Sequence, residues 1–104
     1  MSRASQLNAL VKKLQSESPD IEGCAIISED SLIIASALPQ DIPELRLAGM
    51  CATMLSLGTR AARELQRGSL EQVLVRGENG YVAMMTASGG AMLMTLTNAK
   101  AKLG

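Results

Sequence analysis

The longest patterned stretch, residues 41–68, has the apolar periodicity of an amphipathic helix. Asp41, with Glu44 three residues later, forms a capping-box pattern. Pro43 suits the first turn, where its missing N–H needs no partner. Gly68 follows the last turn, where a left-handed residue commonly ends a helix. The pattern therefore predicts one long central helix.

The apolar arc of this helix covers roughly half of its circumference, whereas a one-sided surface helix needs a stripe of about 100°. The opposite arc carries no charge between Arg46 and Arg60. Its residues between these two arginines are small: Gly49, Thr53 and Ser56. We interpret this as a helix that packs both on its own sheet and on a second helix. The alternative is an ordinary core helix with a poorly charged outer face.

The chain before the central helix predicts a first helix and a hairpin. Leucines recur at helical spacing within residues 2–16, and lysines take the other side. Two short apolar runs, residues 21–28 and 31–38, flank an acidic turn and predict paired strands. Both runs are apolar at consecutive positions, which is typical of strands covered on both faces.

The chain after the central helix predicts three strands, at residues 70–76, 81–87 and 91–97. Tight turns join them, so neighbouring strands are expected to pair antiparallel. Residues 98–104 favour a helix but are too few to form one alone. The fold class expected is α+β. A single five-stranded antiparallel sheet carries the first helix on one face and the central helix on the other, in a profilin-like layered architecture.

The strand at residues 70–76 follows a long connection and is expected to leave one edge of the sheet open. A second copy that pairs edge to edge across a two-fold axis would cover this edge and bring the two central helices side by side. The residues expected in this dimer interface are Ala48, Gly49, Ala52, Thr53, Ser56, Arg60, Leu70, Gln72, Val73, Leu74 and Val75.

The composition excludes several classes of function. The 104 residues fit a single domain, 1–104, and ten basic residues balance ten acidic ones. Zero net charge argues against non-specific nucleic-acid binding and against a polybasic membrane anchor. No secretory signal and no membrane-spanning run is present in the sequence. Cys24 and Cys51 lie in apolar segments, so we expect buried thiols in a cytoplasmic protein.

Catalytic chemistry is also not expected. The chain has no histidine, phenylalanine or tryptophan, and Tyr81 is its one aromatic residue. Without histidine it lacks the usual general base, the partner of a nucleophilic serine or cysteine, and the commonest metal ligand. It also lacks an aromatic platform for stacking bases. We therefore expect no metal, no cofactor and no catalytic residue.

Four segments resemble the Roadblock family, the fold of dynein light chains and GTPase regulators. They are IEGCAIISEDSLIIAS, RAARELQRGSLEQVLV, GENGYV and GAMLMTLTNAKAKLG. The resemblance covers nearly the whole chain and implies a homodimer whose sheet continues across both copies, with antiparallel central helices. Relatives serve as platforms for small Ras-like GTPases, including the bacterial gliding-motility regulator, or as adaptors in dynein and membrane complexes. Many relatives continue into a further helix, so that helix is expected to be missing or vestigial here.

The resemblance suggests two contact sites for partners. Arg46, Arg60, Arg63 and Arg67 are candidate contacts for a small GTPase; the alternative is a solvated helix end that suits the helix dipole. Met92 and Met94 share one strand face and are candidates for an apolar groove that holds a partner helix; the alternative is core packing.

The function expected is a homodimeric, non-catalytic scaffold or regulator of a small Ras-like GTPase. One alternative is a structural adaptor subunit of a larger complex. Another is a small-molecule sensor, which the lack of converging polar residues makes less favourable.

Overall fold

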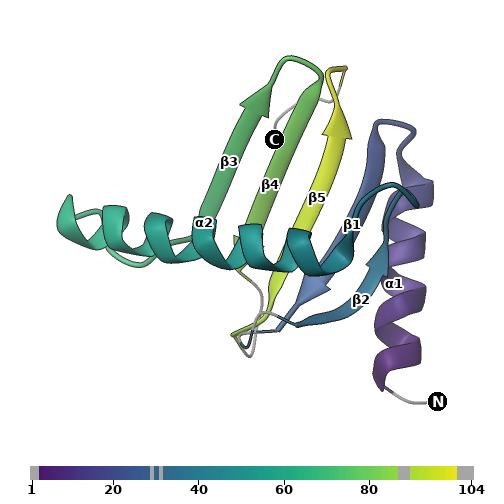
Figure 1. Cartoon of the computed structure of the whole chain (residues 1–104), viewed down its shortest axis with the longest axis horizontal. Coiled ribbons are helices and arrows are strands. Elements are labelled where there is room, and N and C mark those ends of the chain that lie inside the picture. Colours follow the sequence, from purple (N-terminus) through teal and green to yellow (C-terminus); the bar gives the residue numbers. More distant parts are fainter. Residues whose placement is uncertain (1–2, 29, 31, 87–89, 101–104) are drawn as a thin grey trace.

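The computed structural model describes residues 3–28, 30, 32–86 and 90–100. Its five strands form one antiparallel sheet in the order β2-β1-β5-β4-β3 (Figure 1). This confirms the predicted α+β class and the predicted order of elements. The elements are α1 (Arg3–Glu17), β1 (Ile21–Ile27), β2 (Ile33–Ala37), α2 (Glu44–Glu64), β3 (Gln72–Gly77), β4 (Gly80–Thr86) and β5 (Met92–Asn98).

The position of the interior strand β1 between two helices explains why its sequence is apolar at consecutive positions. Cys24 and Ile26 face α1, whereas Ala25 and Ile27 face α2 on the other side of the sheet. Successive side chains of a strand point to opposite faces, so a strand between two helices needs apolar residues on both. The prediction of a strand covered on both faces is therefore confirmed.

The two helices bury separate cores on the two faces of the sheet. The larger core lies beneath α2 and the smaller one beneath α1, which packs against β1 and β2. The larger core contains Ala25, Ile27, Leu47, Cys51, Met84, Met92 and Met94, and the smaller one contains Val11, Cys24, Ile26 and Ala35.

The predicted capping box at the start of α2 is wrong. Pro43 occupies the N-cap position, and no side chain caps the helix there. The Glu44 carboxylate instead accepts a hydrogen bond of 2.8 Å from the Ser36 hydroxyl on β2. The Glu44 side chain is engaged in this contact with Ser36. It therefore does not reach back to Asp41, which lies before the helix.

The end of α2 also differs from the prediction. Gln66, not Gly68, is the left-handed residue that closes the helix, with φ of 58°. Its N–H donates to the Arg63 carbonyl (3.1 Å), and the Arg67 N–H donates to the Ala62 carbonyl (2.6 Å). These two bonds form a Schellman motif. Gly68 has a positive φ of 86° but lies beyond the motif.

The turn between β3 and β4 depends on one glycine. Gly80, and not Asn79, has the positive φ. A side chain at Gly80 would also collide with the Thr97 carbonyl of β5. Of the predicted segment 98–104, residues 101–104 lie outside the described residues. Residues 29, 31 and 87–89 of the predicted strands and turns also lie outside them.

Candidate interaction surface

The long helix α2 is longer than the sheet beneath it is wide. It crosses the strands and continues past β3, so that its C-terminal end has none of the described strands below it (Figure 1). Along α2, the buried residues Leu47, Ala48 and Cys51 all lie in the half nearer the N-terminus. The other half of the helix therefore carries apolar residues that this chain leaves exposed, including Leu57 at 65% exposure.

Strand β3 ends the sheet and pairs only with β4 in the described part of the chain. The Thr86 N–H donates to the Glu71 carbonyl, which makes these two residues a hydrogen-bonded pair. Such pairs alternate along an antiparallel ladder, so Val73 and Val75 are the next residues of β3 to bond to β4. The residues between them direct their backbone N–H and C=O groups to the open edge. These residues are Gln72, Leu74 and Arg76.

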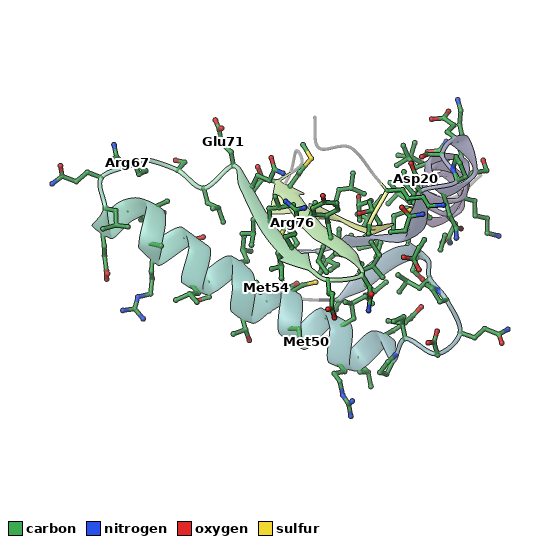
Figure 2. The ribbon with its side chains drawn as sticks, turned by 90° about the horizontal axis from the view of Figure 1, so that it is seen from above. Asp20, Met50, Met54, Arg67, Glu71 and Arg76 are labelled. Atoms are coloured by element: carbon green, nitrogen blue, oxygen red, sulfur yellow. The ribbon has the colours of Figure 1, made fainter. Side chains whose placement is uncertain are left out.

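A groove of about 730 Å³ separates α2 from this end of the sheet. Its walls are mostly apolar, with Met50 and Met54 on successive turns of α2 and two valines on the sheet (Figure 2). Met50 is 51% exposed, so no side chain of the described residues fills the space beside it. The residues that line the groove are Arg46, Leu47, Gly49, Met50, Thr53, Met54, Val75 and Val82.

One line of exposed residues runs along α2 beside this groove, and we call it the outer stripe. Its members are three or four positions apart, so they lie on one side of the helix. It has opposite charges at its two ends and small or apolar residues between them. The outer stripe consists of Arg46, Met50, Thr53, Leu57, Ala61 and Glu64.

Two glycines of α2 show which sides of the helix are occupied. A Cβ atom at Gly58 would lie 3.1 Å from the Val73 side chain and 3.3 Å from that of Leu70. A Cβ atom at Gly49 would have no neighbour within 4 Å in the described part of the chain. Gly58 thus lets α2 approach the start of β3 closely, whereas Gly49 borders space that the described residues do not fill.

The comparison with known families identifies this fold. The family model of the Roadblock/LC7 domain matches residues 7–97. The chain belongs to the Roadblock/LC7 family. An uncharacterized protein of Methanocaldococcus jannaschii, MJ0310, is 36% identical over 84 residues, which span 81% of this chain and 73% of the relative.

Solved structures agree with this assignment. The Roadblock/LC7 domain from Streptomyces avermitilis is 27% identical with a TM-score of 0.72, covering 93% of this chain and 83% of that one. Myxococcus xanthus MglB has a TM-score of 0.88 at 16% identity, covering 100% of this chain and 78% of MglB. LokiProfilin1 also matches, with a TM-score of 0.62 at 17% identity over 98% of this chain and 85% of that one, consistent with the profilin-like layers. The family and the fold identify the chain as a regulatory or interaction module.

The structure places most residues predicted for the dimer interface of this Roadblock/LC7 domain on one end of the molecule. The prediction of Ala48 for this interface is wrong, because Ala48 is only 6% exposed and is already buried within the chain. Two further exposed residues, Met50 and Leu57, belong to the broad apolar arc of the predicted helix and were not predicted for the interface. The signal was present, since that arc was too wide for one contact. The predicted residues that are exposed or half-buried are Gly49, Ala52, Thr53, Ser56, Arg60, Leu70, Gln72, Val73, Leu74 and Val75.

The four predicted GTPase contacts do not form one cluster. Arg46 lies fourteen residues before Arg60, or about 21 Å along the helix axis. Arg60 is 3.5 Å from the carboxylate of Glu64 on the next turn. Arg63 and Arg67 are exposed near the end of α2, and Arg67 lies well away from the sheet (Figure 2).

The partner-helix groove predicted at Met92 and Met94 is wrong. Both side chains point toward α2 and are buried in the larger core. The reason is the position of β5 in the middle of the sheet, where α2 covers it. The exposed apolar residues of the other sheet face lie closer to the β3 edge, at Leu74 (41% exposed) and Met85 (49% exposed).

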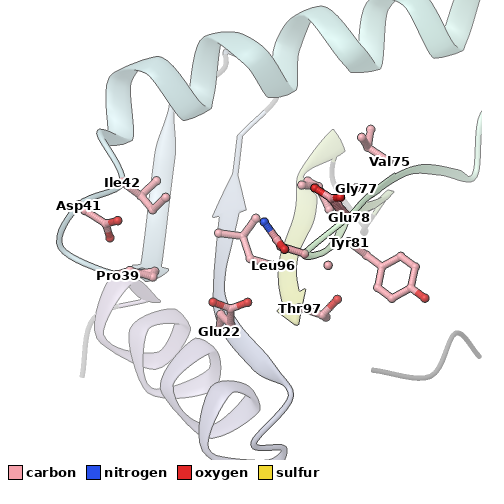
Figure 3. A pocket seen from close by; sticks show the side chains of 13 residues that line it. Glu22, Pro39, Asp41, Ile42, Val75, Gly77, Glu78, Tyr81, Leu96 and Thr97 are labelled. Carbon is pink, nitrogen blue, oxygen red and sulfur yellow. The ribbon is translucent and has the colours of Figure 1, made fainter. Parts of the chain in front are cut away.

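A second hollow, of about 460 Å³, lies at the end of the sheet beside the β3–β4 turn. Three carboxylates come from three different segments, and Figure 3 shows Glu22, Asp41 and Glu78 spread around the hollow without converging on one point. The buried hydroxyl of Thr97 lines the same hollow and has no hydrogen-bond partner among the described residues. This arrangement offers no focus for a small ligand.

The two thiols are inert parts of the two cores. The Cys24 thiol donates a hydrogen bond of 3.1 Å to the Val11 carbonyl, and Cys51, on α2, is buried in the larger core. Burial raises the pKa of both thiols above their ordinary value of 9.0. A raised pKa leaves little of the nucleophilic thiolate at neutral pH. The expectation of buried thiols is therefore confirmed. Within the described ranges, no helix combines the length and apolar character that crossing a membrane requires.

Proposed function

We propose that this protein is a homodimeric, non-catalytic module that docks or regulates a small Ras-like GTPase. The observation that carries the proposal is the coincidence of two incomplete features at one end of the molecule. Among the described residues, the outward backbone groups of the β3 edge have no partner strand, and nothing fills the apolar groove beside α2. One contact with a second copy would complete both features.

The geometry of α2 supports a second copy as the occupant. Because α2 continues past β3, pairing two β3 edges would carry the projecting end of each α2 over the sheet of the other copy. A two-fold axis makes the two contacts identical and closes the assembly. Each exposed apolar side chain that is then removed from water contributes about 25 cal/mol for every Å² buried.

The GTPase part of the proposal rests on the exposed end of α2. Arg63 and Arg67 flank Leu65, which is 69% exposed. Arginine is enriched among the residues that dominate protein interfaces, and its charge steers an acidic partner surface. A dimer would present this group twice. The similarity to MglB and the resemblance to GTPase regulators favour a GTPase as the partner. Such a module would act by positioning groups of the GTPase.

The solution mass tests the dimer. Light scattering over a range of concentrations should give twice the chain mass of 10.9 kDa, stable on dilution to the low micromolar range. A mass of one chain at every concentration would contradict the homodimer.

Capture of a purified small Ras-like GTPase from the same genome tests the partner. We expect the wild-type protein to retain one nucleotide state, GDP or a non-hydrolysable GTP analogue, at least tenfold more than the other. The double variant Arg63→Glu and Arg67→Glu should lose this capture and remain dimeric. Charge reversal of Lys12 and Lys13 on α1 is the matched control. Capture that ignores the nucleotide would favour the adaptor function instead.

A further inference from the structure

We infer that Arg46 of one copy pairs with Glu64 of a second copy, and that the two symmetric pairs fix the register of the antiparallel α2 helices. This inference rests on the proposed homodimer. It adds which residues of the helix face each other, and it identifies the charges that exclude neighbouring registers.

The β3 edge limits where the two-fold axis can pass. The outward-facing residues are Gln72, Leu74 and Arg76, with Leu74 in the middle. Two β3 strands centred on Leu74 place Gln72 opposite Arg76 and Leu74 opposite its own copy. This pairing uses all three outward-facing residues of each strand, whereas any shifted pairing uses fewer. The axis therefore passes beside Leu74.

The point where α2 crosses β3 then limits where along the helix the two-fold axis can pass. Met54 lines the groove together with Val75, and Gly58 approaches Val73. The helix thus crosses β3 between Met54 and Gly58, one turn apart. An axis that passes beside Leu74 meets α2 within that turn.

Within this turn, a two-fold axis that passes beside Leu55 brings opposite charges of the two helices together. We call the residue beside the axis the centre of the helix pair. Arg46 and Glu64 each lie nine residues from Leu55, so they face each other in an antiparallel pair. Thr53 and Leu57 each lie two residues from it and face each other in the middle. All four residues besides Leu55 belong to the exposed outer stripe.

Neighbouring centres do not give this match. A centre at Thr53 places Arg46 opposite Arg60, since each lies seven residues away, and like charges then meet twice. A centre at Leu57 places the Glu64 carboxylate opposite Met50, since each again lies seven residues away. Both alternatives lose the attractive pair.

The pairs contribute more to register than to affinity. Glu64 and Arg60 are 68% and 72% exposed as side chains, so solvent weakens any one pair at this end of the helix. Charge pairs at the rim of an interface discriminate between arrangements because the wrong arrangement brings repulsion.

Mixing two charge-reversal variants tests the inference. Arg46→Glu alone places two glutamates opposite each other at both ends of its homodimer, and Glu64→Arg alone does the same with two arginines. A mixed dimer of the two variants has opposite charges at both contacts. We expect native mass spectrometry at low salt to show a ratio of mixed dimer to homodimers about ten times the statistical ratio. The preference should fall as salt is added, because salt screens the pairs.

The control variant is Arg63→Glu, which lies 100° around the helix from Glu64 and so outside the pair. Mixed with Glu64→Arg, it should show no such preference. A statistical mixture of Arg46→Glu and Glu64→Arg would overturn the register while leaving the dimer intact. A monomeric wild-type protein would overturn both the register and the homodimer. A second test is the salt dependence of the dissociation constant, which should rise with salt for the wild-type dimer. The double variant Arg46→Gln and Glu64→Gln should not show this salt dependence.

Discussion

The two ends of the sheet differ in how they are protected. At the β2 end, α1 packs against β1 and β2, and Val11 is completely buried between helix and sheet. At the β3 end, Leu74 and Val75 are exposed, β3 pairs only with β4 among the described strands, and the C-terminal end of α2 projects past them. The chain thus packs its own helix α1 against the β2 end, whereas the described residues place no such helix beside the β3 end.

This difference shows how one short chain separates stability from association. The covered end supplies a core that stabilises the single chain. The open end exposes apolar groups that rarely remain exposed on a solitary soluble protein, which is the usual mark of an interaction surface. Substitutions at the two ends should therefore change two different measured quantities.

The largest expected effect is on association. Thr53→Asp would place a carboxylate between the paired helices without a partner, and by symmetry it does so twice. We expect the dissociation constant of the dimer to rise about 100-fold in analytical ultracentrifugation. The helical circular dichroism spectrum should not change. Ser16→Asp, at a site on α1 that is also exposed, is the matched control and should leave the dimer intact.

Replacing one valine at each end of the sheet by alanine should lower the free energy of unfolding by different amounts. In the monomeric Thr53→Asp background, Val11→Ala removes methyl groups from a filled core and should lower the free energy of unfolding by about 2 kcal/mol. Val75→Ala, at a half-exposed position, should lower it by less than about 1 kcal/mol. Urea denaturation measures both values. Equal losses would mean that the β3 end is as well packed as the β2 end.

The two glycines of α2 should respond differently in the same background. Gly49→Ala gains helix propensity without a steric cost and should raise the free energy of unfolding by about 1 kcal/mol. Gly58→Ala should gain less or lose stability, because its Cβ atom would crowd Val73. Thermal unfolding of the two variants checks the order. A larger gain at Gly58 would contradict the close contact between α2 and β3.

The smallest effect concerns the projecting tip of α2. Gln66 holds a left-handed conformation that glycine adopts without strain. Gln66→Gly should therefore raise the free energy of unfolding by about 0.5–1 kcal/mol. Denaturant unfolding provides the measurement. A loss of stability would show that the Gln66 side chain makes a contact that outweighs the backbone strain.

The sequence predicted the fold well because its patterns are local. Consecutive apolar residues around Ala25 identified a strand covered on both faces, and the broad apolar arc of α2 indicated a helix with two contacts. The sequence could not determine which side chains of α2 face the sheet and which face solvent. The phase of α2 against the sheet depends on how the helix crosses the strands, so Ala48, which was predicted for the interface, is buried and Met50 is exposed. The order of strands likewise put Met94 beneath α2, which no local pattern records.

The central claim is that the β3 edge pairs with a second copy, and amide hydrogen exchange on β3 tests it most directly. The amides of Val73 and Val75 bond to β4 within one chain, so their exchange should not depend on protein concentration. The amides of Gln72, Leu74 and Arg76 point to the open edge. We predict that their exchange slows at least tenfold as the concentration rises through the dissociation constant. Fast exchange of these three amides at concentrations where the protein is dimeric would contradict the account.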